Sequence, residues 1–307
     1  MQEFDLVIVG AGVAGLTAAM VAARHGLKVV VVDQVGVGGR ISTAERIENF
    51  PGFPQGIAGH ELGPLLHEQA ESAGASFMLD TITAIEPGNQ HIVRGGTETF
   101  RAGAVIIAAG SLPRSLGIPG EERLQGRGVS HCASCDGPFF KGQEVGVVGG
   151  GDAALDEALV LAEHAAQVTI FHRRPTLRAQ HALIERASGK IAIAFDTIVE
   201  EILGDDAVAG VRLRDVVSGA TRTQALKALF VQVGAEPNTA LLRGVLALDP
   251  MGHIETDAMM HTSVPGIFAA GDIRKSSVAQ LAAVAGDGAT AAVAAFRYLK
   301  ARGCRVG

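Results

Sequence analysis

Short apolar runs that alternate with helix-forming segments dominate the pattern along the chain. The first two runs are "DLVIV" (5–9) and "KVVVVD" (28–33), and an Ala-rich helical segment lies between them and ends near Gly26. Later runs of the same kind are "AVII" (104–107), "VGVV" (145–148), "VTIF" (168–171) and "GIFAA" (266–270). Strands that alternate with helical segments are typical of parallel sheets, so the pattern predicts an α/β fold.

A glycine-rich turn follows the first strand and opens the first helix. It reads G-x-G-x-x-G, with Gly10, Gly12, Ala14 and Gly15, and the second strand ends in Asp33. The glycines permit a tight turn and a close approach of a pyrophosphate to the helix N-terminus, and the acid accepts hydrogen bonds from an adenosine ribose. Because strand, turn, helix and acid occur in this order, we interpret the turn as a dinucleotide site rather than an ordinary Gly-rich turn.

A second copy of the pattern begins at the strand near residues 145–148. The turn that follows it contains Gly149, Gly151, Asp152, Ala153 and Ala154. No acid ends the next strand, and the basic residues His172, Arg173, Arg174 and Arg178 stand there instead. A carboxylate would repel a 2′-phosphate, whereas guanidinium groups bind it bidentately. The second copy therefore predicts a site for NADPH rather than NADH, and the alternative is a solvated basic turn.

Two further segments indicate that the first site holds FAD. The strand at 104–107 runs into Ala109 and Gly110, and the strand at 266–270 runs into Gly271 and Asp272. An Asp after a strand-ending Gly can approach the ribityl and pyrophosphate region of FAD, and a small-residue helix follows at 285–296. The alternative for each segment taken alone is an ordinary strand-turn. These segments flank the NADPH module on both sides. We therefore expect two nested Rossmann-like domains of three-layer ββα architecture: a discontinuous FAD domain (1–114 and 240–307) and an inserted NADPH domain (115–239).

The pair Cys132 and Cys135 forms a C-x-x-C motif just before the second glycine-rich turn. A zinc site is the alternative, but no second C-x-x-C and no H-x-x-x-H exists to complete it. At a helix start the pair suits redox chemistry, because backbone N–H groups there lower a thiol pKa. Asp136 is either a proton donor for this pair or a helix cap. Cys304 has no partner in sequence and is interpreted as a bystander thiol.

Composition and charge argue against a nucleic-acid-binding or membrane-spanning protein. The 307 residues carry a net charge of −6 with a pI near 5.9, which argues against a nucleic-acid partner because no basic surplus exists to neutralise phosphates. Apolar residues make up 48% and charged ones 19%, so a large core is expected, and no apolar run is long enough to span a membrane. The N-terminus enters a strand without a basic segment, so we expect no signal peptide and a cytoplasmic protein.

The motifs together resemble one known family, the low-molecular-weight thioredoxin reductases of bacterial type. The segments that carry the resemblance follow the family's order and spacing over essentially the whole chain: "GAGVAGLTAA", "ERIENFPGF", "GRGVSHCASCDG", "GGGDAALDEAL", "HRRPTLRA", "GAEPNT" and "GIFAAGDIR…AGDGATAA". The resemblance implies an FAD- and NADPH-dependent homodimer that reduces thioredoxin or a thioredoxin-like protein. It adds to the FAD contacts Gly39, Arg40, Asn49, Ala279 and Gln280.

The resemblance also implies a role for each residue of the redox motif. Cys132 and Cys135 would form a disulfide, with Cys135 next to the flavin and Cys132 attacking the partner's disulfide. Asp136 would match the family's proton donor. Three departures alter the side chains expected near the flavin: Arg40 replaces a Gln, Ala279 replaces an Arg, and the chain has no Trp and one Tyr. The alternative functions are a dithiol oxidase and a reductase fed by another donor such as ferredoxin, and both should lack the basic cluster at His172–Arg174.

Overall fold

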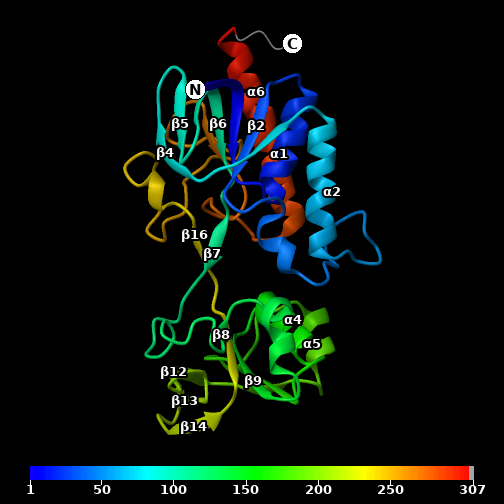
Figure 1. The fold of residues 1–307 in the computed structure, drawn as a ribbon, viewed down its shortest axis with the longest axis vertical. Coiled ribbons are helices and arrows are strands. Elements are labelled where there is room, and N and C mark those ends of the chain that lie inside the picture. Colours follow the sequence, from blue (N-terminus) through cyan, green and yellow to red (C-terminus); the bar gives the residue numbers. More distant parts are fainter. Residues whose placement is uncertain (304–307) are drawn as a thin grey trace. The chain divides into compact units, whose positions relative to one another are not determined.

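The structure, a computed structural model, describes residues 1–303 and divides into two units (Figure 1). Unit 1 comprises Met1–Leu112 and the residues from Glu236 onward, and unit 2 comprises Pro113–Ala235. Both changes of unit fall within a two-stranded sheet of β7 (Ser111–Pro113) and β16 (Ala235–Pro237). The chain therefore leaves unit 1 and returns to it through two paired segments, close to the positions 114/115 and 239/240 expected from sequence.

Unit 1 is built on a seven-stranded sheet with the order β3-β2-β1-β6-β5-β4, and β17 pairs with β6 as well. Its strands are β1 (Gln2–Val9), β2 (Val29–Asp33), β3 (Ser76–Leu79), β4 (Ile82–Glu86), β5 (His91–Gly95), β6 (Thr99–Ile107) and β17 (Ile267–Ala269). Its helices are α1 (Val13–Arg24), α2 (Gly59–Ser72) and α6 (Leu281–Ala301), with 3-10 turns η1 (Gly39–Thr43) and η3 (Ala240–Leu242). Strands β1, β2, β3, β6 and β17 pair in parallel, as Rossmann-like folds require.

Strand β6 is the centre of this sheet because three strands pair with it. Strand β1 follows one edge, in parallel, from Phe100 to Ile107. On the other edge, β5 pairs antiparallel with Thr99–Ala102, and β17 pairs in parallel with Val105–Ile107. The C-terminal half of β6 thus depends on a strand that lies far along the sequence.

The central strands of unit 1 bury both faces, and alternate residues belong to different cores. Leu6 and Ile8 pack with α1 and α6, whereas Val7 and Val9 pack on the opposite face with β4 and β5. Figure 1 shows the helices on one side of the sheet and β4 and β5 on the other. Two buried faces explain why these strands read as unbroken apolar runs.

Unit 2 repeats the same three layers on a smaller scale. Its parallel sheet has the order β11-β10-β9-β15-β8, and an antiparallel sheet of β12-β13-β14 lies apart from it. The strands are β8 (Val129–Ser130), β9 (Glu144–Gly149), β10 (Gln167–Phe171), β11 (Ala192–Ala194), β12 (Thr197–Leu203), β13 (Gly210–Asp215), β14 (Thr221–Ala225) and β15 (Ala228–Gln232). The helices are α3 (Ala133–Asp136), α4 (Asp152–Leu161) and α5 (His181–Ala187), with the 3-10 turn η2 (Gly137–Phe140).

Helices cover one face of the unit 2 sheet and the antiparallel strands cover the other. Val145 and Val147 pack with α4, whereas Val148 packs with the apolar residues of β12 and β13. In both units helices cover one face of the parallel strands and antiparallel strands cover the other: β4 and β5 continue the sheet of unit 1, and β12–β14 form a separate sheet in unit 2. This arrangement confirms the predicted fold class. Among the described residues, no helix is both long enough and apolar enough to cross a membrane.

Candidate active site

The glycine-rich turn between β1 and α1 leaves open space at its middle glycine. A Cβ at Gly10, which has φ of 108°, would meet the Ala108 carbonyl oxygen at 2.4 Å, and one at Gly15 would meet the Gly10 oxygen at 1.9 Å. Both positions therefore exclude every larger residue. A Cβ at Gly12 would have no neighbour within 4 Å. The turn is packed from beneath and open above Gly12, at the N-terminus of α1, where a pyrophosphate would sit.

Asp33 ties this turn to the end of β2. One carboxylate oxygen accepts the N–H of Ala11 at 2.8 Å, and the other accepts the N–H groups of Val35 and Gly36 at 2.8 and 2.9 Å. A carboxylate can accept about four hydrogen bonds, so capacity remains for a ribose hydroxyl. The expected contact with the adenosine ribose stays a prediction, and the backbone contacts show that Asp33 also shapes the loop.

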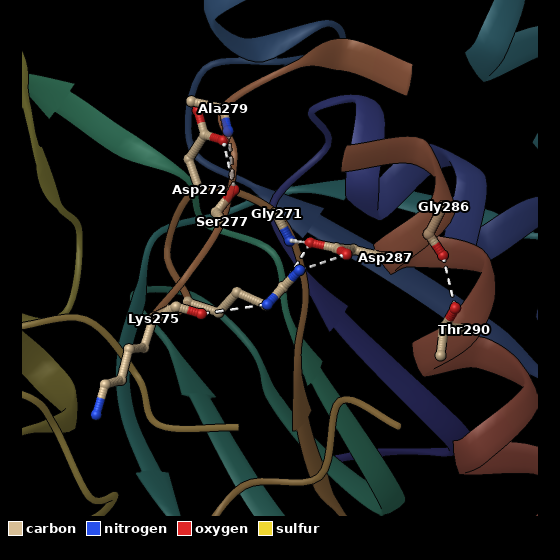
Figure 2. Close-up of polar contacts among 9 residues, drawn as sticks. Gly271, Asp272, Lys275, Ser277, Ala279, Gly286, Asp287 and Thr290 are labelled. Carbon is tan, nitrogen blue, oxygen red and sulfur yellow. Dashed lines mark hydrogen bonds and ion pairs between the residues drawn. The ribbon is translucent and has the colours of Figure 1, made fainter. Parts of the chain in front are cut away.

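A network of hydrogen bonds and one ion pair holds the turn at Gly271 and Asp272 (Figure 2). Gly271 has φ of 81°, and a Cβ there would approach the side chains of Ala14 and Val284 at 3.1 and 3.4 Å. Its N–H donates to Asp287 of α6 at 3.1 Å. Asp272 accepts the Ser277 hydroxyl at 3.2 Å, and that hydroxyl accepts the Ala279 N–H at 3.3 Å.

Asp287 is buried and forms a bidentate ion pair with Arg274. The Nε of Arg274 donates to one Asp287 oxygen at 2.6 Å, and Nη2 donates to the other at 2.8 Å. Three donors thus converge on this carboxylate, counting the Gly271 N–H. The pair fixes the turn after β17 to the second turn of α6, which itself packs on α1. The position of Gly271 therefore depends on a charge buried in α6.

The other residues expected to bind FAD lie on loops around the C-terminal edge of the same sheet. Arg40 donates to the Ser111 hydroxyl at 3.3 Å, directly after Ala109 and Gly110. The Asn49 amide donates to the Gln280 side chain at 3.2 Å, although 231 residues separate the two. Gly39 approaches Gly12, since its Cβ would meet the Gly12 Cα at 3.2 Å.

These observations show that the residues of unit 1 fit an FAD molecule. The open space above Gly12 lies at a helix N-terminus, where N–H groups favour phosphates. Asp33 at the end of β2 supplies hydrogen-bonding groups, and so do Asn49, Asp272 and Gln280 from the segments that follow β2 and β17. The contact of each of these residues with FAD is a prediction.

The second glycine-rich turn, in unit 2, has the same construction as the first. A Cβ at Gly149 would meet the Gln232 carbonyl oxygen at 2.5 Å, whereas one at Gly151 would have no neighbour within 4 Å. Ala154 is fully packed in α4 and replaces the third glycine. Asp152 at the start of α4 accepts the backbone and side-chain N–H groups of Gln180 at 2.8 and 2.5 Å.

The basic residues after β10 divide into one buried group and three exposed groups. His172 is buried against Gly150, and its Nε2 lies 3.0 Å from the Thr176 carbonyl oxygen. It therefore shapes the segment that carries the arginines. Arg173, Arg174 and Arg178 are exposed, and the Arg178 N–H bonds the Gly150 carbonyl at 2.7 Å. An open glycine beside exposed guanidinium groups fits a dinucleotide with a 2′-phosphate.

Cys132 and Cys135 form a disulfide at the start of α3. Cys132 is half-buried and Cys135 is exposed. The Cys132 N–H donates to the Ser130 hydroxyl at 3.1 Å, and the Cys132 sulfur accepts the Cys135 N–H at 3.2 Å. Asp136 ends α3, and its side chain caps neither α3 nor η2. Asp136 therefore has no capping role here, and the predicted role as proton donor stays a prediction.

Sequence reasoning missed three polar residues of these sites. Asp287 holds the Gly271 turn, Gln180 holds Asp152, and Glu157 of α4 accepts the Ala133 N–H at the start of α3. Each of these residues contacts a partner that lies far from it in the sequence, and only tertiary packing brings the two together. Cys304, interpreted above as a bystander, lies outside the described residues.

Comparisons with known proteins agree with this arrangement. Residues 4–289 match the family model described as pyridine nucleotide-disulphide oxidoreductase. The chain is 44% identical over 301 residues to the thioredoxin reductase of Treponema pallidum, covering 97% of each chain. The crystal structure of Lactococcus lactis thioredoxin reductase superposes with a TM-score of 0.94 at 39% identity, over 97% of this chain and 99% of that one.

A second solved structure shows the same likeness. The thioredoxin reductase of T. acidophilum superposes with a TM-score of 0.93 at 34% identity, again over 97% of this chain and 99% of that one. Matches of this extent confirm the resemblance drawn from the motifs. The chain therefore belongs to the pyridine nucleotide-disulphide oxidoreductase family, as a thioredoxin reductase of the bacterial type, a group that uses FAD and NADPH.

Proposed function

We propose that this chain carries electrons from NADPH through FAD and the Cys132–Cys135 disulfide to the disulfide of a thioredoxin or thioredoxin-like protein. One observation carries the proposal: the disulfide and the second dinucleotide turn belong to the same unit. Exposed arginines beside that turn favour NADPH over the donors that a dithiol oxidase or a ferredoxin-fed reductase would use. Membership of the family supports the same assignment of cofactors and partner.

The two units take different cofactors in this proposal. Unit 1 would hold FAD through Gly10, Gly12, Ala14, Gly15, Asp33, Gly39, Arg40, Asn49, Ala109, Gly110, Gly271, Asp272, Ala279 and Gln280. Unit 2 would hold NADPH through Gly149, Gly151, Asp152, Ala153, Ala154, Arg173, Arg174 and Arg178, with His172 shaping the site. When bound, NADPH supplies a hydride and FAD relays its two electrons to a disulfide.

The chain's own residues carry out the thiol chemistry. Reduction of the disulfide by two electrons and two protons gives the thiols of Cys132 and Cys135. The Cys132 thiolate then attacks one sulfur of the partner's disulfide, and the other sulfur leaves as a thiolate that takes up a proton, with Asp136 as the proposed donor. Cys135 then loses its thiol proton, and its thiolate attacks the Cys132 sulfur of the mixed disulfide. The partner's second sulfur leaves as a thiolate and takes up a proton, which releases the reduced partner and restores the original disulfide.

The test is an anaerobic titration of the purified protein. Addition of NADPH should bleach the flavin absorbance near its visible maximum, and addition of oxidised thioredoxin should restore it. NADH at the same concentration should act far more slowly. A flavin that NADPH leaves oxidised would refute the electron donor, and a reduced flavin that thioredoxin leaves bleached would refute the acceptor.

Assembly and location complete the proposal. We expect a homodimer, because the family resemblance implies one, and light scattering after gel filtration should give about twice the 31.6 kDa mass of the chain. We also expect the protein in the cytoplasm of its host, where NADPH is available. Fractionation of native cells tests this expectation, and an appearance in the membrane or secreted fraction would contradict it.

A further inference from the structure

We propose that Glu157 is a positioning residue, whose carboxylate caps α3 and thereby restrains formation of the Cys132 thiolate once the disulfide is reduced. This inference deepens the proposed function, on which it rests for the meaning of the redox pair. Glu157 accepts the N–H of Ala133, the first residue of α3, through one carboxylate oxygen. It belongs to α4, so it reaches the redox motif from a different element.

Packing fixes Glu157 in this place. Ala133 is fully buried in one core with Ala154, Leu155 and Ala158 of α4. Glu157 directly precedes the buried Ala158 in α4 and is itself only partly exposed. Because the packing of Ala133 on α4 does not involve the disulfide, we expect the carboxylate to stay at the start of α3 when the disulfide is reduced.

The Cys132 sulfur and the Glu157 carboxylate share the N–H groups at the start of α3. The sulfur accepts the Cys135 N–H at 3.2 Å, and the carboxylate accepts the Ala133 N–H. Free N–H groups at a helix start stabilise a thiolate, which lowers the pKa of the thiol. A carboxylate that occupies one of them removes part of this stabilisation and adds a like charge, and both effects raise the pKa of the thiol.

Other ionisable groups also lie on or beside α3. His131 places Nδ1 at 2.8 Å from the Val231 carbonyl oxygen, and Asp152 of α4 is engaged by Gln180. Asp136 directly follows Cys135 and is the last of the four residues of α3, and Asp156 of α4 is exposed. Lys141 follows η2 and is exposed. The Glu157 carboxylate contacts the start of the redox helix directly, through the N–H of Ala133.

The restraint suits a protein that donates electrons. A disulfide becomes a strong oxidant when its reduced form is stabilised as a thiolate. A carboxylate that disfavours the thiolate has the opposite effect, so the dithiol of Cys132 and Cys135 becomes a stronger reductant. Thiolate is then formed mainly when a partner's disulfide is in place to be attacked.

The experiment measures the Cys132 thiol alone. In a background with Cys135→Ser and Cys304→Ser, the full-length, FAD-loaded protein is treated with iodoacetamide between pH 5 and 10, and the alkylation rate at each pH gives the apparent pKa. The variant Glu157→Gln keeps an acceptor but removes the charge, and the pKa should fall by about one unit. Glu163→Gln, which removes an exposed charge beyond the end of α4, is the matched control and should leave the midpoint unchanged.

Two outcomes would overturn the inference. One is an alkylation midpoint that is the same in Glu157→Gln as in the parent, and the other is a midpoint that rises. If Glu157→Gln fails to give a folded, yellow protein, Glu157→Asp takes its place, because it moves the charge away from α3 by one methylene. Its alkylation midpoint should also fall, and an unchanged or higher midpoint would overturn the inference. The alkylation profile does not involve NADPH or thioredoxin, so failure of the proposed function would leave this result standing.

Discussion

The ion pair of Arg274 and Asp287 offers the sharpest test of how unit 1 holds its cofactor turn (Figure 2). The Arg274 and Asp287 side chains are only 16% and 9% exposed, and three hydrogen bonds of 2.6, 2.8 and 3.1 Å reach the carboxylate. Asp287→Ala removes the acceptor and leaves a guanidinium and the Gly271 N–H without it. Breaking a buried pair in this way costs about 3–5 kcal/mol of unfolding free energy.

A matched control stands one residue along the chain. Lys275 and Glu255 also form an ion pair, at 2.9 Å, but their side chains are 51% and 48% exposed. Exposed pairs contribute about 0–1 kcal/mol. Glu255→Ala therefore removes the ion-pair partner of Lys275, the residue next to Arg274, at little cost, and the difference between the two variants isolates the effect of burial.

The assay uses the chain's single tyrosine. Tyr298 lies on α6 against Phe268 of β17, and the chain contains no Trp, so tyrosine fluorescence reports on unit 1 alone. Urea unfolding of the FAD-loaded proteins, at one fixed FAD concentration, gives the unfolding free energy of that unit. The midpoint should fall sharply for Asp287→Ala and barely for Glu255→Ala.

A double-mutant cycle completes the argument. Arg274→Met alone should also destabilise unit 1, and the double variant Arg274→Met with Asp287→Ala should cost much less than the sum of the two single changes. Additive costs would show that the two side chains do not act as a pair. If Asp287→Ala costs no more than Glu255→Ala, the reasoning from burial is wrong.

Three further predictions concern the cofactor, the disulfide and acid stability. Arg173→Ala with Arg174→Ala should raise the KM for NADPH more than tenfold and leave that for NADH nearly unchanged, because a charge-assisted contact to phosphate is worth about 1.5–3 kcal/mol; equal effects in steady-state assays would exclude a role in reading the 2′-phosphate. Cys135→Ser should retain FAD and its bleaching by NADPH but lose thioredoxin reduction, and retained activity would place the disulfide chemistry elsewhere. Burial of Asp80 acts to raise its pKa, but the N–H groups of Glu98, Thr97 and Thr81 and the Thr97 hydroxyl outweigh it and lower the pKa from 3.8 to about 2. The ionised carboxylate therefore stabilises the fold above about pH 4 and loses this effect as the pH falls towards 2, so the difference in urea midpoint between parent and Asp80→Asn should shrink over that interval.

The strands, helices and glycine turns were predictable because their signals are local. Each apolar run directly precedes its glycine-rich turn in the sequence, and the roles of Gly10 and Gly149 follow from the spacing of the glycines after the strand. Asp287 escaped prediction because it stands in a helix of small residues, where a single acid has no neighbour in sequence that points to Arg274. Glu157 escaped it for the same reason, since its partner Ala133 contributes only a backbone N–H.

The role of His172 in the structure differs from the role that its basic neighbours in the sequence suggest. In sequence it heads a basic cluster and reads as one more contact for a phosphate. In the structure it is buried against Gly150 and lies within hydrogen-bonding distance of Thr176, whereas the three arginines remain exposed. The charge pattern in the sequence could not distinguish His172, which shapes the turn, from the arginines, which are exposed to solvent.

The pairing of β17 with the C-terminal half of β6 sets the order in which a ribosome can deliver the parts of this protein. All strands of the unit 2 parallel sheet lie between residues 113 and 235, so that unit leaves the exit tunnel complete. Synthesis of unit 1 begins first, but its sheet and helical layer are complete only after β17 and α6 have been synthesised. At about 5–20 residues per second, the remaining chain takes several seconds to arrive. During that interval the Val105–Ile107 edge of β6 lacks its partner strand, and an unpaired strand edge can pair with another chain.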